Sequence, residues 1–155
     1  MKRREALKLA GIAAGVAIAG APSSSEAESP VAGLKPITGD AQPISTGERK
    51  ARIQNAQRLM KQQGIDAILL EPGSAMLYFS GVSWWRSERL TAVIIPREGE
   101  IGIVTPFFEE PSVRESMTIG GDVRTWHEHD NPYKRVSGFL SDRGISNGRI
   151  GLEGT

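Results

Sequence analysis

The first strong pattern in the chain is a helical one, between residues 48 and 63. No glycine or proline interrupts this stretch, and its apolar side chains recur three and four positions apart, as they do along one face of an α-helix. Ser45 and Glu48 have the spacing of a capping box, and Gly64 follows where a left-handed helix cap is favoured. The side chains expected to form the buried face are Ile53, Ala56, Leu59 and Met60.

Five short runs rich in Val, Ile and Leu have the length and the flanking residues of β-strands. They span residues 66–70, 89–95, 101–105, 122–126 and 149–152. Only Pro96 and the turn-forming residues 97–100 separate the second run from the third, a pattern that predicts a β-hairpin. The other runs are separated by segments long enough to carry helices.

Two of these segments, residues 107–117 and 133–143, are predicted to be helices, and Pro132 stands where a helix start favours proline. A shorter helix over residues 74–79 is closed by Gly81. The side chains that we expect these two longer helices to bury are Phe107, Phe108, Val113, Met117, Tyr133, Val136, Phe139 and Leu140. Because helices alternate with strands and one hairpin is inserted, the chain is predicted to be an α/β protein with a mixed β-sheet flanked by helices.

The first residues have the pattern of an export signal. Arg3 and Arg4 precede an apolar run over residues 9–21, and small residues follow as far as Ala27. The run is shorter than the ~20 residues that a membrane-spanning helix needs, so no stable membrane span is expected. Residues 1–27 are therefore predicted to be a signal peptide, and the paired arginines favour the twin-arginine route to the periplasm or the extracellular space. A cytoplasmic amphipathic helix is the alternative.

Composition and charge narrow the class of the remaining chain. Residues 28–46 contain Pro30, Pro36 and Pro43 and show no apolar period, so we expect a flexible linker there. The formal net charge is +1, and the excess of basic residues belongs to the leader, so the charge gives no support to nucleic-acid binding. Because the sequence has no cysteine, disulfides and thiolate metal sites are excluded.

The run from His127 to Asp130 is the only cluster with metal-binding chemistry. Zinc sites need three or four ligands, whereas alternate positions of a strand place only His127 and His129 on one face. The pattern favours another interpretation, a polar loop in which Asp130 or Asn131 caps the following helix. We therefore assign no metal ligand in this chain, and a small metal-binding protein that uses the two histidines stays a third hypothesis.

Several phrases follow one another along residues 46–155 in a fixed order. They are ERKARIQNAQRLMKQQGIDAILL, MLYFSGVSWWRSERLTAVIIP, TPFFEE, TWHEHDNPY and GRIGLEGT. In this order they resemble the N-terminal domain of the creatinase/prolidase family, which precedes a metal-dependent catalytic domain in aminopeptidase P, prolidase and creatinase. The phrases SWWRSER and TWHEHDNPY point to the Xaa-Pro peptidase branch. The resemblance implies one domain over residues 47–155 with a ribonuclease H-like sandwich of sheet and helices.

The same resemblance implies that the catalytic part lies outside this chain. In the family, two divalent metal ions (Mn, Zn or Co) are bound by two Asp, one His and two Glu of the catalytic domain, which follows a strand like GRIGLE. The sequence stops at Thr155, so no catalytic or metal residue is assigned here. The chain is expected to be a fragment that is inactive alone, whereas the full-length relative is a proline-specific metallopeptidase.

The resemblance also implies which residues face a substrate. The substrate-side candidates are Trp84, Trp85, Arg86 and Arg89, with His127 and His129 as weaker, cleft-facing candidates. An indole face offers a flat apolar wall to a proline ring, and a guanidinium group offers paired donors to a peptide carboxylate. The alternative is that one tryptophan lies in the core and that the arginines pair with Glu88.

Two functions of different class remain open at this point. The first is an assembly and substrate-gating domain of an exported Xaa-Pro aminopeptidase or dipeptidase, in a dimer or tetramer. Its partners are then the missing catalytic domain and proline-containing peptides. The second is a stand-alone periplasmic binding or interaction module that has lost enzyme activity. In the first case we expect an exposed apolar patch where the missing domain packs.

Overall fold

The computed structural model describes residues 33–35 and 37–153. The predicted signal peptide and the first part of the predicted linker lie outside these residues. The chain divides into two units, Met1–Ala41 and Gln42–Thr155. The described residues of the first unit form no helix or strand, and all the elements below belong to the second unit.

Helices and strands of the second unit alternate in the order that the sequence predicts. They are α1 (Thr46–Gln63), β1 (Ala67–Leu70), α2 (Ser74–Ser80), β2 (Ala92–Pro96), β3 (Gly102–Pro106), the 3₁₀-helix η1 (Phe107–Glu109), α3 (Glu110–Ser116), β4 (Asp122–Trp126), α4 (Pro132–Ser141) and β5 (Ile150–Leu152). Every predicted element is present, although the helix expected from residue 107 begins as η1. No helix within the described part of the chain has both the length and the apolar character that a membrane span requires.

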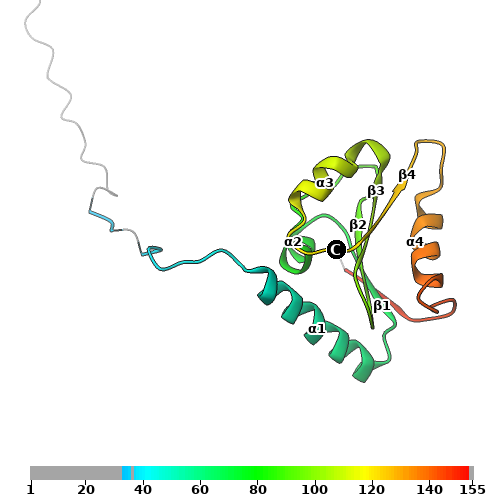
Figure 1. Ribbon diagram of the computed structural model, residues 1–155, viewed down its shortest axis with the longest axis horizontal. Coiled ribbons are helices and arrows are strands. Elements are labelled where there is room, and N and C mark those ends of the chain that lie inside the picture. The colour runs from blue at the N-terminus through cyan, green and yellow to red at the C-terminus, as the bar shows by residue number, and fades with distance from the viewer. Residues whose placement is uncertain (1–32, 36, 154–155) are drawn as a thin grey trace, which may run out of the picture. The chain divides into compact units, whose positions relative to one another are not determined.

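The five strands form one mixed sheet in the order β4-β3-β2-β1-β5. β2 is antiparallel to β1 and to β3, as the predicted hairpin requires, whereas β3 with β4 and β1 with β5 are parallel pairs. Figure 1 shows α2 and α3 on one side of the sheet and α4 on the other. The predicted α/β fold, a mixed sheet flanked by helices, is therefore confirmed.

Alternation along the two central strands builds a core on each face of the sheet. Val93, Ile95 and Ile103 join the core beneath α1, α2 and α3. Ile94 and Val104 point the other way and join the core beneath α4. Because both faces are covered, β2 and β3 are hydrophobic without interruption rather than alternating with polar residues.

The predicted caps define both ends of α1. The Ser45 hydroxyl oxygen accepts the N–H of Glu48 at 3.1 Å, and Gly64 has the left-handed φ of 66° that a glycine adopts without strain. The Glu48 carboxylate does not return to the cap, because it pairs with Arg52 one turn later. Only one half of the expected capping box is therefore formed.

The buried face of α1 differs in part from the prediction. Ile53 and Met60 are buried as expected, but Leu59 is 40% exposed. Arg49 is buried instead, because its guanidinium group donates to the carbonyl groups of Leu77 and Tyr78 at the end of α2. Periodicity marks the apolar face, but it gives no sign that an arginine is buried on the same helix.

Three aromatic residues predicted to lie in the core are exposed. Phe107, Phe108 and Tyr133 expose 54%, 59% and 67% of their surfaces, whereas Val113 and Phe139 of the same segments are buried as predicted. Phe107 and Phe108 lie on η1, ahead of the α-helical turn that carries Val113 into the core. The prediction for these three aromatic side chains is therefore wrong.

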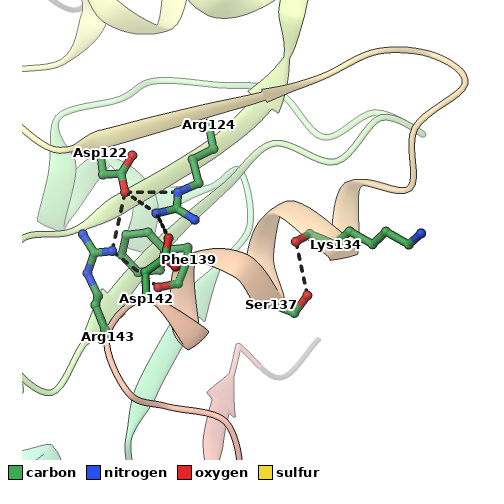
Figure 2. Close-up of polar contacts among 7 residues, drawn as sticks. All are labelled: Asp122, Arg124, Lys134, Ser137, Phe139, Asp142 and Arg143. Carbon is green, nitrogen blue, oxygen red and sulfur yellow. Dashed lines mark hydrogen bonds and ion pairs between the residues drawn. The ribbon is translucent and has the colours of Figure 1, made fainter.

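Ion pairs fix α4 to β4 (Figure 2). Arg124 of β4 donates to Asp122 and to Asp142, both at 2.7 Å, and Arg143 lies 3.5 Å from the Asp122 carboxylate. The two guanidinium carbons lie 5.3 Å and 3.5 Å from the ring centroid of Phe139, which is fully buried. Charge pairing and cation–π contact thus act together where the end of α4 meets β4.

The stability of this cluster should depend on pH. The pKa of Asp122 is lowered below its ordinary 3.8, chiefly by the hydrogen bond from Arg124. A carboxyl group with a lowered folded-state pKa stabilises the fold fully above its unfolded pKa, and that contribution disappears as the pH falls through the folded-state pKa. We expect Asp122→Asn to unfold at a lower temperature than the parent at neutral pH. The unfolding temperatures of the two proteins, measured as a function of pH, should converge well below pH 3.8. A temperature difference that is constant at every pH would contradict this.

Candidate functional site

The carboxyl ends of β1, β3 and β4 lie together at one end of the sheet, beside the start of β2. Ligands of α/β proteins bind preferentially just outside the carboxyl ends of the strands. We call the residues that cover this end of the sheet the strand-end surface: Glu71, Pro72, residues 85–91, Phe107, Phe108 and residues 127–133. Segments that are far apart in the sequence, including most of the predicted candidates, meet here.

A pocket of about 160 Å³ opens on the strand-end surface. Its lining comes from Glu71 and Pro72 after β1, from residues 86–91, and from Tyr133 of α4. Both predicted arginines, Arg86 and Arg89, lie within this range. The structure thus places the two arginines at one pocket, together with a tyrosine that the sequence pattern assigned to the core.

Arg89 is held firmly by its neighbours. Its Nε donates to Glu128 at 2.8 Å, its Nη1 to Glu88 at 2.6 Å, and its guanidinium carbon lies 5.6 Å from the ring centroid of Phe108. The hydrogen bond to Glu128 is the main cause of its raised pKa. Arg89 therefore joins the loop before β2 to the turn after β4. It also pairs with Glu88, as the alternative interpretation of the arginines expects.

Arg86 is more available than Arg89. Its side chain is 54% exposed, and Glu71 at 3.3 Å is its one ion-pair partner among the described residues. An exposed guanidinium group with a single partner keeps donors free for another carboxylate, which it can bind through two parallel N–H bonds. Of the two predicted arginines, Arg86 therefore keeps more of its donors free in the described structure.

The two tryptophans of this loop have different environments. Trp84 is half-buried and packs against the core beneath α1, α2 and α3, whereas Trp85 is 90% exposed. The alternative that one tryptophan lies in the core therefore applies to Trp84. Trp85 leaves most of its indole open to solvent.

His127 and His129 lie together in the turn after β4. Their rings are stacked with centroids 5.7 Å apart, and the ring of Phe107 lies 4.7 Å from that of His127. No group of three metal-ligating side chains converges anywhere in the described range. These residues do not fit the two-metal site of the creatinase/prolidase resemblance, so no catalytic step is derived for them.

The polar-loop interpretation of this turn agrees with the geometry. The side chain of Asn131 accepts the N–H of Tyr133 at 2.9 Å and so caps α4. Asp130 instead accepts the main-chain N–H of His127, and this bond is the main cause of its lowered pKa, with a smaller effect from Arg135. These hydrogen bonds stabilise the turn just before α4 begins.

Sequence reasoning missed several parts of this surface. Glu71 and Glu128, which bind the two arginines, follow no local pattern that links them to their partners. Phe107, Phe108 and Tyr133 were placed in the core. No local signal set them apart from the buried Val113 and Phe139, because a core-facing helix stripe about 100° wide admits neighbouring aromatic residues.

Comparison with known proteins agrees with this architecture. The Creatinase/Prolidase N-terminal domain family matches residues 52–155. The Mycobacterium tuberculosis protein named "Probable dipeptidase PepE" is 30% identical over 91 residues, which cover 57% of this chain and 24% of that protein. An uncharacterized peptidase of Schizosaccharomyces pombe is 29% identical over 115 residues, covering 65% and 26%. The chain thus spans about a quarter of the length of these relatives.

Solved structures show the same fold. A dipeptidase from Pyrococcus horikoshii is 30% identical with a TM-score of 0.58, and the match covers 67% of this chain and 28% of that one. The N-terminal domain of an Xaa-Pro dipeptidase from Lactobacillus brevis has a TM-score of 0.60 at 18% identity, covering 66% and 75%, which shows likeness of fold alone. With a family match over more than half of its length and this sheet topology, the chain belongs to the Creatinase/Prolidase N-terminal domain family.

Proposed function

We propose that this chain is the non-catalytic N-terminal domain of an exported Xaa-Pro dipeptidase or aminopeptidase, and that its strand-end surface borders the substrate cleft. One observation carries the proposal. In a domain of this family, an exposed tryptophan, Trp85, is followed directly by an arginine with free donors, Arg86, at the edge of a pocket. An apolar wall beside a carboxylate-binding fork suits a short peptide with a proline ring and a free carboxyl end.

The four residues first suggested by the sequence divide into two pairs under this proposal. Trp85 and Arg86 contact the peptide, the indole against the proline ring and the guanidinium group on the carboxylate. Trp84 and Arg89 hold the loop in shape, the first through the core and the second through Glu128. Selectivity for short peptides then follows from a rigid wall on one side of the cleft.

The partners of the proposed domain follow from the same surface. Phe107, Phe108 and Tyr133 are exposed, which supports packing of this surface against a catalytic domain or a neighbouring subunit. The proposal includes a homodimer or homotetramer of the full-length enzyme. In this proposal two divalent ions (Mn, Zn or Co) would be bound by residues of the catalytic domain, not of this chain, and would supply a nucleophilic hydroxide there. The leader, with Arg3 and Arg4 before an apolar run, supports export by the twin-arginine route.

Peptide binding without cleavage is the result that tests this proposal. Titration of the chain with an Xaa-Pro dipeptide in the presence of Mn²⁺ should change the tryptophan emission, because Trp85 is the most exposed indole of the three. Chromatography of the same mixture should recover the dipeptide uncleaved. Turnover that a chelator abolishes, or the absence of any binding, would contradict the proposal.

Variants assign the binding to this loop. Arg86→Ala should weaken binding by about tenfold, the value of one charge-assisted contact of ~1.4 kcal/mol. Arg58→Ala is the matched control, because Arg58 is an exposed arginine of α1 that bonds only to Asn55 and Gln62 in the described structure. The Trp85→Ala variant lacks the fluorescent reporter, so its affinity for the dipeptide is measured by calorimetry. Equal affinity of the Arg86 and Arg58 variants would exclude Arg86 as the carboxylate-binding residue.

A further inference from the structure

Asn147 and Gly148 lie in the second half of the loop that leads from α4 into β5, residues 142–149. Both are exposed, and the backbone bends there outside any helix or strand. The loop borders a groove of about 510 Å³ between α4 and β5, which Gly148, Lys134 and Ser137 help to line; Figure 2 shows the last two on α4. Water therefore has open access to the side-chain amide of Asn147.

Asn147 is unlike the other two asparagines of the chain. Asn55 lies inside α1, where the next N–H is held in a helical hydrogen bond. Asn131 precedes Pro132, which has no N–H. Gly148, in contrast, has no Cβ to shield its nitrogen, and its N–H has no hydrogen-bond partner among the described residues. Only the nitrogen after Asn147 is both present and free to reach the preceding side chain.

We propose that Asn147 is a site of spontaneous deamidation. The Gly148 nitrogen loses its proton and attacks the Asn147 side-chain carbonyl carbon. A new C–N bond forms, the bond to the amide nitrogen breaks, and ammonia leaves with the proton, so that a cyclic imide remains. One water molecule then opens the imide at either carbonyl, which gives aspartate or isoaspartate. Nothing is oxidised or reduced.

The modification falls beside a carboxylate that organises this end of the sheet. Asp66 accepts the N–H of Arg149 at 2.9 Å and donates its own N–H to the Arg149 carbonyl at 2.9 Å. It also pairs with Arg97 at 2.8 Å. A Cβ on Gly148 would come within 2.8 Å of the Asp66 carboxylate, so the backbone is close-packed there. The aspartyl product therefore adds a second negative charge two residues before Arg149, whose main chain Asp66 holds.

Isoaspartate has a second effect, on β5. The isomer carries the main chain through the former side chain and lengthens the backbone by one methylene group just before the strand. β5 is only three residues long, and among the described strands it pairs with β1 alone. Its partners are Ala67↔Ile150, Ile68↔Gly151 and Leu69↔Leu152. A short edge strand with one partner has little to hold its register, so the isoaspartyl form should detach β5 from β1.

Incubation of the intact chain in mildly alkaline buffer, followed by trypsin digestion and mass spectrometry, tests the first step. The peptide of residues 144–149 should lose its amide and give separate aspartyl and isoaspartyl products, while Asn55 and Asn131 keep theirs. A synthetic peptide of the same six residues, treated in parallel, gives the rate for an unconstrained chain. The proposal is overturned if Asn147 stays amidated over the time in which the free peptide converts.

Two variants separate the consequences. Asn147→Gln should stop the reaction, because its longer side chain forms the corresponding ring much more slowly. Asn147→Asp introduces the charge without the backbone change. Hydrogen exchange should show loss of protection at residues 150–152 in the aged parent, little loss in Asn147→Asp, and none at β3 and β4. Unchanged protection of β5 in isoaspartyl-rich protein would overturn the proposed effect on the strand.

Discussion

Phe139→Ala is expected to lower the free energy of unfolding by about 3–5 kcal/mol, a large share of the ~5–15 kcal/mol of a typical domain. Phe139 is fully buried in the core beneath α4. Gly102 of β3 faces its ring so closely that a Cβ there would collide with it, so the site is filled without spare room. Removal of the ring leaves a cavity and also deprives Arg124 and Arg143 of their cation–π partner.

Urea unfolding of the whole chain measures this loss. Tyr133→Ala serves as the matched control, because it removes an aromatic ring from the same helix at a position that is 67% exposed. Its expected change is within about 0.5 kcal/mol. Equal losses in the two variants would show that α4 does not contribute to stability through the face that buries Phe139.

Arg49→Ala is expected to cost about 1.5–3 kcal/mol, the range for hydrogen bonds to a charged group. Arg49 is 7% exposed and donates to the carbonyl groups of Leu77 and Tyr78 near the end of α2. The Leu77 carbonyl also accepts the N–H of Gly81, and the Tyr78 carbonyl also accepts from Arg52. The charge of Arg49 also lies at the negative end of the α2 dipole. Two arginines of α1 thus bond to the end of α2, and Arg49 is the buried one.

Two further variants locate the origin of that loss. Arg58→Ala removes an exposed arginine from the same helix and should change stability by less than about 0.5 kcal/mol. Arg49→Met keeps the apolar stem but removes the hydrogen bonds that Arg49 donates to the α2 carbonyl groups. It also removes a buried Nε that has no partner in the described structure. If Arg49→Met is as stable as the parent, Arg49 contributes to the free energy of unfolding through the packing of its stem and not through its hydrogen bonds to α2.

Local sequence features predicted the elements well because they act over a few residues. Gly64 and Gly81 end α1 and α2 in left-handed conformations of φ 66° and 84°, as glycine permits. The five β-branched runs became the five strands. Such features are decided by neighbours in the chain, so no knowledge of the tertiary structure was needed to find them.

The candidate site was predicted only in part, because its geometry depends on distant residues. The sequence pointed to the loop from Trp84 to Arg89, but not to the difference between a packed Trp84 and an exposed Trp85. Glu128 follows Arg89 by 39 positions, and nothing near either residue indicates that they bind. The roles of Arg86 and Trp85 in peptide binding stay predictions.

The sequence by itself determined the order and type of the helices and strands, their caps, and the family, because all of these depend on patterns of a few neighbouring residues. The tertiary structure alone decided the strand order, the burial of Arg49, and the exposure of Phe107, Phe108 and Tyr133. The physical reason is that periodicity shows which side chains are apolar, whereas the number of faces that other elements cover decides which of them are buried.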